Sequence, residues 1–425
     1  MKPDVLDIYG VEDNVKKNFC AVPWLEPYVN TYGSYSLCCM EQENQADHKI
    51  PINENFQNHW NGKYLKNTRI QIMKGRLPKQ CNICERNEAI GKDSLRQRRN
   101  YRYFGQHEPT VDNPKLRQIQ ADTLEDGSVN ENFPFEGFSF TVGRTCQLGC
   151  VTCSDVYSTF IEKEYKVLKF QSQFKDRRNI NHTIKLDQKT FDENLYTVLK
   201  THIDHLDKLH ITGGEPFLSK KLFQFLEWCY TTGHHSHLTL YITTNGMTMP
   251  SMSNLKILEK FKEVILFFSC DAVGDLEEYI RFPSVWTSKK RNLEIFKNHF
   301  PNITICCTVF AMNCHAVSQV IDYAIDSQVK ITLTTLEEPN FLHVKNLPRM
   351  YKDKVMSSLR NYILPRDYSL SPWLQSHVDS IVNAMEMDHD VESFKKITDM
   401  ITAYDKIRPI NFYQLVETFP KSLLV

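Results

Sequence analysis

The stretch "TVGRTCQLGCVTCSD", residues 141–155, places three cysteines close together, at Cys146, Cys150 and Cys153. Their spacing is C-x-x-x-C-x-x-C, and the next cysteine along the chain is Cys229. Three thiolates on one short loop can hold three corners of an iron–sulfur cube and leave the fourth iron open to a cofactor or substrate. A zinc site is the alternative, but zinc favours four ligands, and no histidine falls near this loop.

The composition excludes several classes of protein. The chain has 425 residues, with 51 basic and 51 acidic side chains, so it has no global positive charge for holding nucleic acid. The opening "MKPDVLDIYG" is charged where a signal peptide needs an apolar run, and no uncharged apolar stretch is long enough to span a bilayer. We therefore expect a cytoplasmic protein without a membrane partner. The 13 cysteines are mostly clustered, which in a reducing compartment favours metal binding or catalysis over disulfides.

From residue 138 onward, short apolar runs alternate with helix-like segments. This alternation predicts an α/β fold with a parallel sheet, either an open barrel or a doubly wound sheet. Each of the first four runs is followed by an unusual segment: the cysteine loop, "TGGEP", "TTNG" and "SCD". In a βα barrel, the catalytic residues lie at these C-terminal ends of the strands. The runs are residues 138–142, 209–212, 238–243, 264–270, 303–310 and 331–336. The helix-like segments are residues 157–174, 190–206, 219–233, 253–261, 290–300 and 316–328.

The chain divides into four parts by composition. Residues 1–104 form a cysteine-rich module, and the polar residues 105–134 are interpreted as a linker or surface excursion. Residues 135–348 carry the repeated βα pattern. Residues 349–425 are expected to be a helical extension without chemistry of its own.

The cysteine spacing, its position after the first strand and the "GGEP" turn are similar to those of the radical S-adenosylmethionine superfamily. The resemblance implies a partial (β/α)6 TIM-like barrel in which Cys146, Cys150 and Cys153 ligate a 4Fe–4S cluster. It further implies that S-adenosylmethionine binds the open iron and is cleaved by one electron to methionine and a 5′-deoxyadenosyl radical. That radical abstracts hydrogen from a substrate, and flavodoxin or ferredoxin would supply the electron. Thr152 departs from the family, which often has an aromatic residue there.

The resemblance also implies a set of cofactor-contacting residues at the strand ends. Two glycines allow the backbone to approach a ligand, and Glu215 can accept a hydrogen bond from an ammonium group. Arg281 matches an arginine near the methionine carboxylate, with a surface ion pair as the alternative. Asn245 either touches the cofactor or caps the helix that follows. The full set is Gly213, Gly214, Glu215, Pro216, Asn245, Ser269, Asp271 and Arg281.

A second cysteine pattern lies in the N-terminal module. The pattern has one cysteine at position 20, a second at position 38 that follows Gly33 by five residues, and a C-x-x-C pair at 81–84. This order resembles the SPASM-like module called twitch. The resemblance implies an auxiliary 4Fe–4S cluster, which would accept an electron from a substrate radical or anchor the lobe over the barrel. Cys39 remains open as a ligand, and four cysteines could also close a structural zinc site. The implied ligands are Cys20, Cys38, Cys81 and Cys84.

Two smaller expectations concern individual residues. Gly149 is interpreted as letting the backbone approach a cluster without a side chain in the way. Cys306 and Cys307 lie inside the fifth strand and are expected to be small buried residues.

The substrate remains open. We favour a peptide or protein, because the N-terminal lobe could form a long cleft. Oxidation of a small molecule is the alternative, and only the basic "RQRRNYR" (96–102) suggests a nucleic acid, although most such runs are solvated faces. Outside enzymes, the alternative is a zinc-stabilised binding protein.

Overall fold

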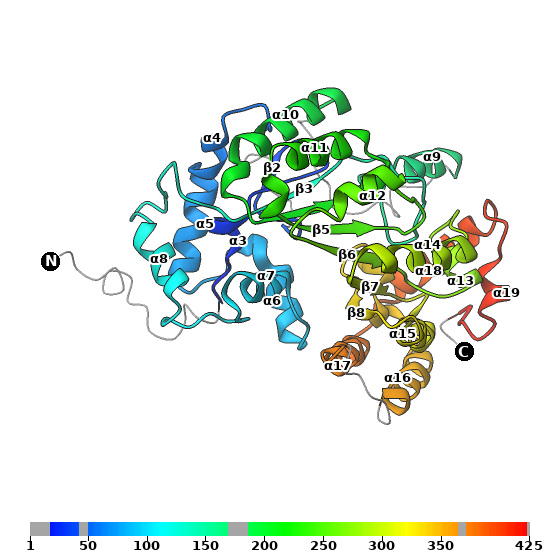
Figure 1. Cartoon of the computed structure of the whole chain (residues 1–425). Helices are drawn as coiled ribbons and strands as arrows, with labels where there is room; N and C mark the ends of the chain where they lie inside the picture. Colours follow the sequence, from blue (N-terminus) through cyan, green and yellow to red (C-terminus); the bar gives the residue numbers. More distant parts are fainter. Residues whose placement is uncertain (1–17, 42–49, 169–185, 364–370, 423–425) are drawn as a thin grey trace. The chain divides into compact units, whose positions relative to one another are not determined.

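The computed structural model describes residues 18–41, 50–168, 186–363 and 371–422 (Figure 1). Within these ranges, eight strands form one sheet in the order β2-β1-β3-β4-β5-β6-β7-β8. Strand β1 pairs antiparallel with β2 and parallel with β3, and β7 pairs in parallel with both β6 and β8. The predicted α/β class with a mostly parallel sheet is therefore confirmed.

The six predicted strands are present, each within one residue of its predicted ends. Two short strands were not predicted, because each has only two residues and shows no alternation to detect. The eight strands are β1 (Tyr28–Val29), β2 (Tyr35–Ser36), β3 (Gly137–Thr141), β4 (Lys208–Thr212), β5 (Thr239–Thr244), β6 (Glu263–Ser269), β7 (Asn302–Val309) and β8 (Lys330–Thr335).

The chain forms two compact units. The first contains Met1–Gly143, Arg178–Ile211 and Trp228–Leu240. The second contains Arg144–Arg177, Thr212–Glu227 and Tyr241–Val425. All four cysteines of the N-terminal pattern belong to the first unit, and the three-cysteine loop belongs to the second.

In the first unit, the two aromatic side chains at the ends of α4 pack in one cluster with Phe135. The ring of Trp60 lies 5.5 Å from that of Phe56 and 5.3 Å from that of Phe135. The segment interpreted as a linker contains helix α8, which begins with Asn113 as its N-cap and Pro114 as its first residue, a combination typical of helix starts. The helices are α3 (Val22–Leu25), α4 (Phe56–Trp60), α5 (Lys63–Met73), α6 (Asn82–Ala89), α7 (Leu95–Phe104), α8 (Pro114–Asp122) and α10 (Gln188–His202).

The second unit is rich in helices, and the described residues after 348 are largely helical, as expected. The end of the helix expected at 157–174 lies outside the described residues. No helix of the described ranges combines the length and apolar character that crossing a membrane requires. The helices are α9 (Thr159–Val167), α12 (Met252–Leu258), α13 (Asp275–Ile280), α14 (Trp286–His299), α15 (Val317–Asp326), α16 (Arg349–Ile363), α17 (Leu374–Glu386), α18 (Val391–Tyr404) and α19 (Phe412–Leu415); α11 (Lys220–Thr231) has residues in both units.

Strands β6 and β7 alternate between a buried face and a half-exposed face. In β7, Ile305 and Cys307 lie on the buried face, whereas Thr304 and Cys306 lie on the other. The expectation of burial is therefore wrong for Cys306 and confirmed for Cys307. Strand alternation places two consecutive residues on opposite faces, so only one of the pair can enter the core.

We predict that Ile305→Ala lowers the free energy of unfolding by about 2–5 kcal/mol, because it opens a cavity on the fully buried face. Thr304→Ala, one residue earlier on the half-exposed face, should cost less than about 1 kcal/mol. Chemical denaturation of both variants measures the difference. Equal losses would show that the two faces of β7 are wrongly assigned.

Candidate functional site

The "GGEP" turn lies directly against the backbone of the cysteine loop. The N–H of Glu215 donates to the carbonyl oxygen of Thr145 at 2.8 Å. A Cβ atom at Gly214 would overlap that same carbonyl group, and Gly213 has a φ of +130°. Both glycines are therefore required by the backbone, and the structure brings these two predicted motifs together.

The cysteine loop is also bonded to the last residue of α13 and to the turn that follows it. The N–H of Gly149 donates to the carbonyl of Phe282 at 2.6 Å, and the N–H of Val151 donates to the carbonyl of Ile280 at 2.8 Å. Together with the bond from Glu215, these contacts fix the loop backbone from two directions.

The expectation that Gly149 lets the backbone approach a cluster stays a prediction, but the structure gives a second reason for a glycine here. A Cβ atom there would overlap the carboxylate of Glu164 and meet the ring of Phe160. The absent side chain makes room for a buried carboxylate of α9, which the linear sequence does not place beside the loop.

The Cys150 thiol lies within electrostatic range of the other two thiols of the loop. Burial raises the pKa of the Cys150 thiol, Arg281 opposes the rise, and the thiols of Cys153 and Cys146 add to it. The Cys146 sulfur accepts a hydrogen bond from the N–H of Leu148 at 3.5 Å. Because buried thiols hold their protons, ligation of a metal here would release them.

Arg281 reaches Cys150 and is held by Asp271. Its Nη1 lies 3.7 Å from the Cys150 sulfur, and its Nη2 lies 2.8 Å from Oδ2 of Asp271. The Arg281 side chain is 11% exposed and that of Asp271 is 0% exposed. The alternative of a surface ion pair is therefore wrong, since this pair is buried beside the cysteine loop.

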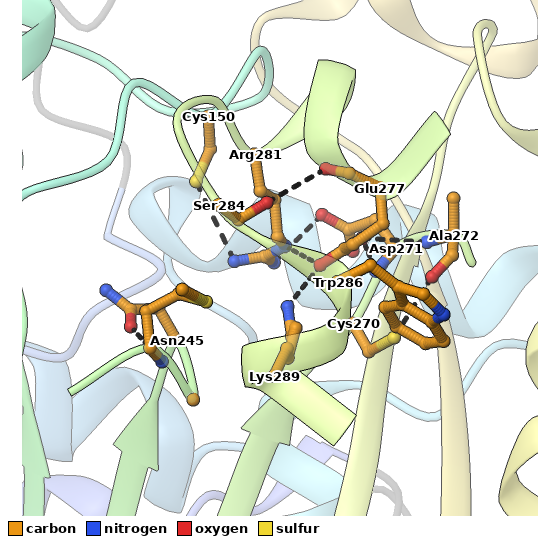
Figure 2. A network of polar contacts seen from close by, with 12 residues as sticks. Cys150, Asn245, Cys270, Asp271, Ala272, Glu277, Arg281, Ser284, Trp286 and Lys289 are labelled. Atoms are coloured by element: carbon orange, nitrogen blue, oxygen red, sulfur yellow. Dashed lines mark hydrogen bonds and ion pairs between the residues drawn. The ribbon is translucent and has the colours of Figure 1, made fainter. Parts of the chain in front are cut away.

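Asp271 and Arg281 belong to a larger buried network (Figure 2). Oδ1 of Asp271 accepts from the backbone N–H of Thr308 at 2.8 Å, and the Asp271 N–H donates to Oε2 of Glu277 at 2.9 Å. Glu277 pairs with Lys289, and both side chains are 0% exposed. Burial raises the pKa of Glu277, and Lys289 and Arg281 oppose that rise. Two acids and two bases thus balance one another in the interior.

Glu215 is engaged by its neighbours. Its carboxylate is 1% exposed and accepts from the Phe217 N–H at 3.1 Å, the Thr244 hydroxyl at 2.8 Å and the Asn245 N–H at 2.7 Å. The pKa of Glu215 is raised to about 7, because the effect of burial exceeds the opposing effect of these hydrogen bonds. In this structure the carboxylate joins the "GGEP" turn to the "TTNG" turn after β5.

Asn245 lies against the cysteine loop. Its Nδ2 is 3.8 Å from the Cys146 sulfur, and its Oδ1 accepts from the Met247 N–H at 2.9 Å. The alternative that Asn245 caps the next helix is wrong, because Ser251 is the N-cap of α12 and accepts from the Asn254 N–H.

The last predicted residues lie at strand ends. Pro216 is buried and begins the short turn Pro216–Leu218, and Ser269 is the half-exposed last residue of β6. Ser269 is in register with Cys306 of β7, which is in register with Thr332 of β8. Thr308 and Thr334 form the next half-exposed row. These β7 and β8 residues were not predicted, although the alternation of their strands would have indicated them.

Four cysteines of the first unit share one pocket, which Arg96 also lines. Burial raises the pKa of Cys20 to about 12, and the Cys84 thiol adds to the rise. Cys39 is exposed and does not line the pocket. The cysteines that line it are Cys20, Cys38, Cys81 and Cys84.

Helix α7 holds the backbone on both sides of Cys20. The Asn100 amide donates to the Phe19 carbonyl at 2.8 Å and accepts from the Ala21 N–H at 2.9 Å. Arg96 donates to the same carbonyl at 2.8 Å and is 1% exposed. The basic run 96–102 is therefore not simply a solvated face.

Among the residues that the structure describes, no group of three or more His, Cys, Asp or Glu side chains is arranged for a single metal ion.

We predict that Asn100→Ala lowers the free energy of unfolding by about 1–3 kcal/mol, because the buried N–H of Ala21 loses its partner. Alkylation of the native protein should accelerate more at Cys20 than at the other pocket cysteines, as read by mass spectrometry. Arg98→Ala, at an exposed position of the same helix, is the control. An equal loss in the control would contradict a specific role for Asn100.

The sequence matches no protein-family model and no curated protein. Several solved structures resemble the chain at low identity. Streptococcus suis SuiB bound to S-adenosylmethionine is 12% identical, with a TM-score of 0.41 over 94% of this chain and 77% of that chain. Native anSMEcpe with bound AdoMet and Cp18Cys peptide is 16% identical, with a TM-score of 0.38 over 53% of this chain and 59% of that chain. TYW1 with a lysine-pyruvate adduct is 17% identical, with a TM-score of 0.30 over 54% of this chain and 71% of that chain.

Proposed function

We propose that this chain is a radical S-adenosylmethionine enzyme with a partial (β/α)6 barrel. One observation carries the proposal. Three thiols at the required spacing lie together on a loop whose backbone is bonded to the "GGEP" turn, and the guanidinium of Arg281 lies 3.7 Å from Cys150.

The residues of the loop fit a cluster with one open iron. Two carboxylates lie within electrostatic range of these thiols, but Glu215 accepts three hydrogen bonds and Asp271 is held by Arg281 and Thr308. Neither is a ready fourth ligand for zinc. A 4Fe–4S cluster bound by the three cysteines would supply the electron that cleaves S-adenosylmethionine.

The surrounding side chains would bind and orient the cofactor. Arg281 is a buried cation at the loop, so it can balance thiolate charge and attract the methionine carboxylate. The "GGEP" backbone would face the amino group, and Asn245 would orient the ligand beside Cys146. Ser269, on the half-exposed face of β6, would donate to a ribose or carboxylate oxygen.

We infer that the substrate is a peptide or protein segment. The half-exposed face offers hydroxyl groups in rows, at Ser269, Thr308, Thr332 and Thr334, which suit the many polar groups of a peptide. SuiB, a protein with a TM-score of 0.39 to this chain, has been solved bound to the precursor peptide SuiA. A small molecule remains the second candidate, and a flavodoxin or ferredoxin would supply the electron.

We also propose that the first unit is a twitch-like module with an auxiliary 4Fe–4S cluster. Its ligands would be the four cysteines that share the pocket, Cys20, Cys38, Cys81 and Cys84. Cys38 is preferred over Cys39 because Cys39 is exposed and lies outside the pocket lining.

We predict that the protein, reconstituted without oxygen, binds about eight iron and eight sulfide per chain. After reduction with S-adenosylmethionine present, it should form 5′-deoxyadenosine, measured by liquid chromatography and mass spectrometry. Alanine at Cys146, Cys150 or Cys153 should remove about half of the iron and abolish this product, whereas Cys39→Ala should change neither. Zinc without sulfide, or a fully loaded protein that forms no 5′-deoxyadenosine, would contradict the proposal.

The auxiliary site has its own test. We predict that Cys38→Ala retains about four iron per chain, because three thiolates hold the second cluster poorly, whereas Cys39→Ala retains about eight. Iron and acid-labile sulfide are measured on both variants. A loss of iron in Cys39→Ala alone would reverse the ligand assignment.

A further inference from the structure

Arg408, in the C-terminal extension just after α18, has a fully buried guanidinium group. Its side chain is 0% exposed, and its guanidinium carbon lies 3.9 Å from the centre of the Tyr404 ring. The sequence indicates no chemistry in this region. An arginine taken out of water must nevertheless find acceptors for its N–H groups, so its partners show what it does.

The partners of Arg408 belong to two segments of the cofactor site. Nη1 donates to the carbonyl of Tyr279 at 2.5 Å, and Nη2 donates to the carbonyl of Gly149 at 2.6 Å. Gly149 immediately precedes Cys150, and Tyr279 lies two residues before Arg281. One planar group therefore joins the cysteine loop to the segment that carries Arg281.

The peptide groups flanking Gly149 are held on both sides. Its N–H donates to Phe282 at 2.6 Å, while its carbonyl accepts from Arg408. Rotation of the following peptide would turn the Cys150 side chain away from Arg281 Nη1, which is 3.7 Å from the sulfur.

The charge of Arg408 is balanced locally. Its Nη2 lies 3.2 Å from Oε2 of Glu164, a buried carboxylate for which Gly149 makes room. Burial raises the pKa of Glu164, and Arg408 opposes the rise. The hydroxyl of Tyr279 also donates to Asp405 at 2.8 Å, so the turn after α18 is bonded to α13 at a second point.

We propose that Arg408 is a positioning residue, which holds Cys150 and Arg281 in the relative geometry that S-adenosylmethionine requires. This inference rests on the proposed function. It adds that the C-terminal extension belongs to the cofactor site.

The test uses Arg408→Lys in the full-length chain. Lysine keeps the charge facing Glu164 but has no planar fork with which to serve two carbonyl groups at once. In the metal-free protein, alkylation of Cys150 should accelerate about tenfold, whereas alkylation of Cys229, in α11, should change less than about twofold. In the reconstituted protein, the Kd for S-adenosylmethionine should rise about tenfold, with an altered EPR spectrum of the reduced cluster in its presence.

The control is Arg349→Lys, an exposed arginine of the same extension that pairs with Glu386. Should Arg408→Lys fold poorly, Arg408→Met combined with Glu164→Gln removes both charges together and takes its place. An unchanged Kd and EPR spectrum, or the same changes in the control, would overturn the proposal. The alkylation assay needs no cluster, so it separates failure of this inference from failure of the proposed function.

Discussion

The thiol of Cys150 lies within electrostatic range of two others on the same loop, and thiolates repel one another, so something outside the loop must hold the three in place. In this protein that constraint is met by backbone hydrogen bonds. The "GGEP" turn holds Thr145, and the end of α13 with the turn after it holds Gly149 and Val151. The loop geometry therefore depends on contacts with residues that are far away in the chain. The cysteine spacing of the loop itself supplies only the thiols that could ligate a metal.

Charge balance is the second part of the same constraint. Asp271, Glu277, Arg281 and Lys289 form a buried group of two acids and two bases beside Cys150. Burying these charges costs desolvation energy that offsets much of their mutual attraction, so the group is better explained by the geometry that it fixes than by stability. Arg408 and Glu164 form a second buried ion pair against the loop, at Gly149.

Much of this could be predicted, because the relevant signals are local in the sequence. The βα pattern indicated all six long strands, and cysteine spacing indicated both candidate sites. What was missed depends on contacts between distant residues or on very short elements. Arg408 meets Gly149 across 259 positions, and the two-residue strands β1 and β2 show no period. Helix α8 was missed because its polar composition concealed its start signal at Asn113.

The central claim is that the three-cysteine loop holds a cluster with one iron that no protein side chain ligates. A crystal structure of the anaerobically reconstituted protein, with anomalous scattering recorded at the iron edge, tests it most directly. The account predicts a four-iron cluster on Cys146, Cys150 and Cys153, with S-adenosylmethionine on the remaining iron. A single tetrahedral zinc ion, or a fourth protein ligand on the cluster, would contradict it.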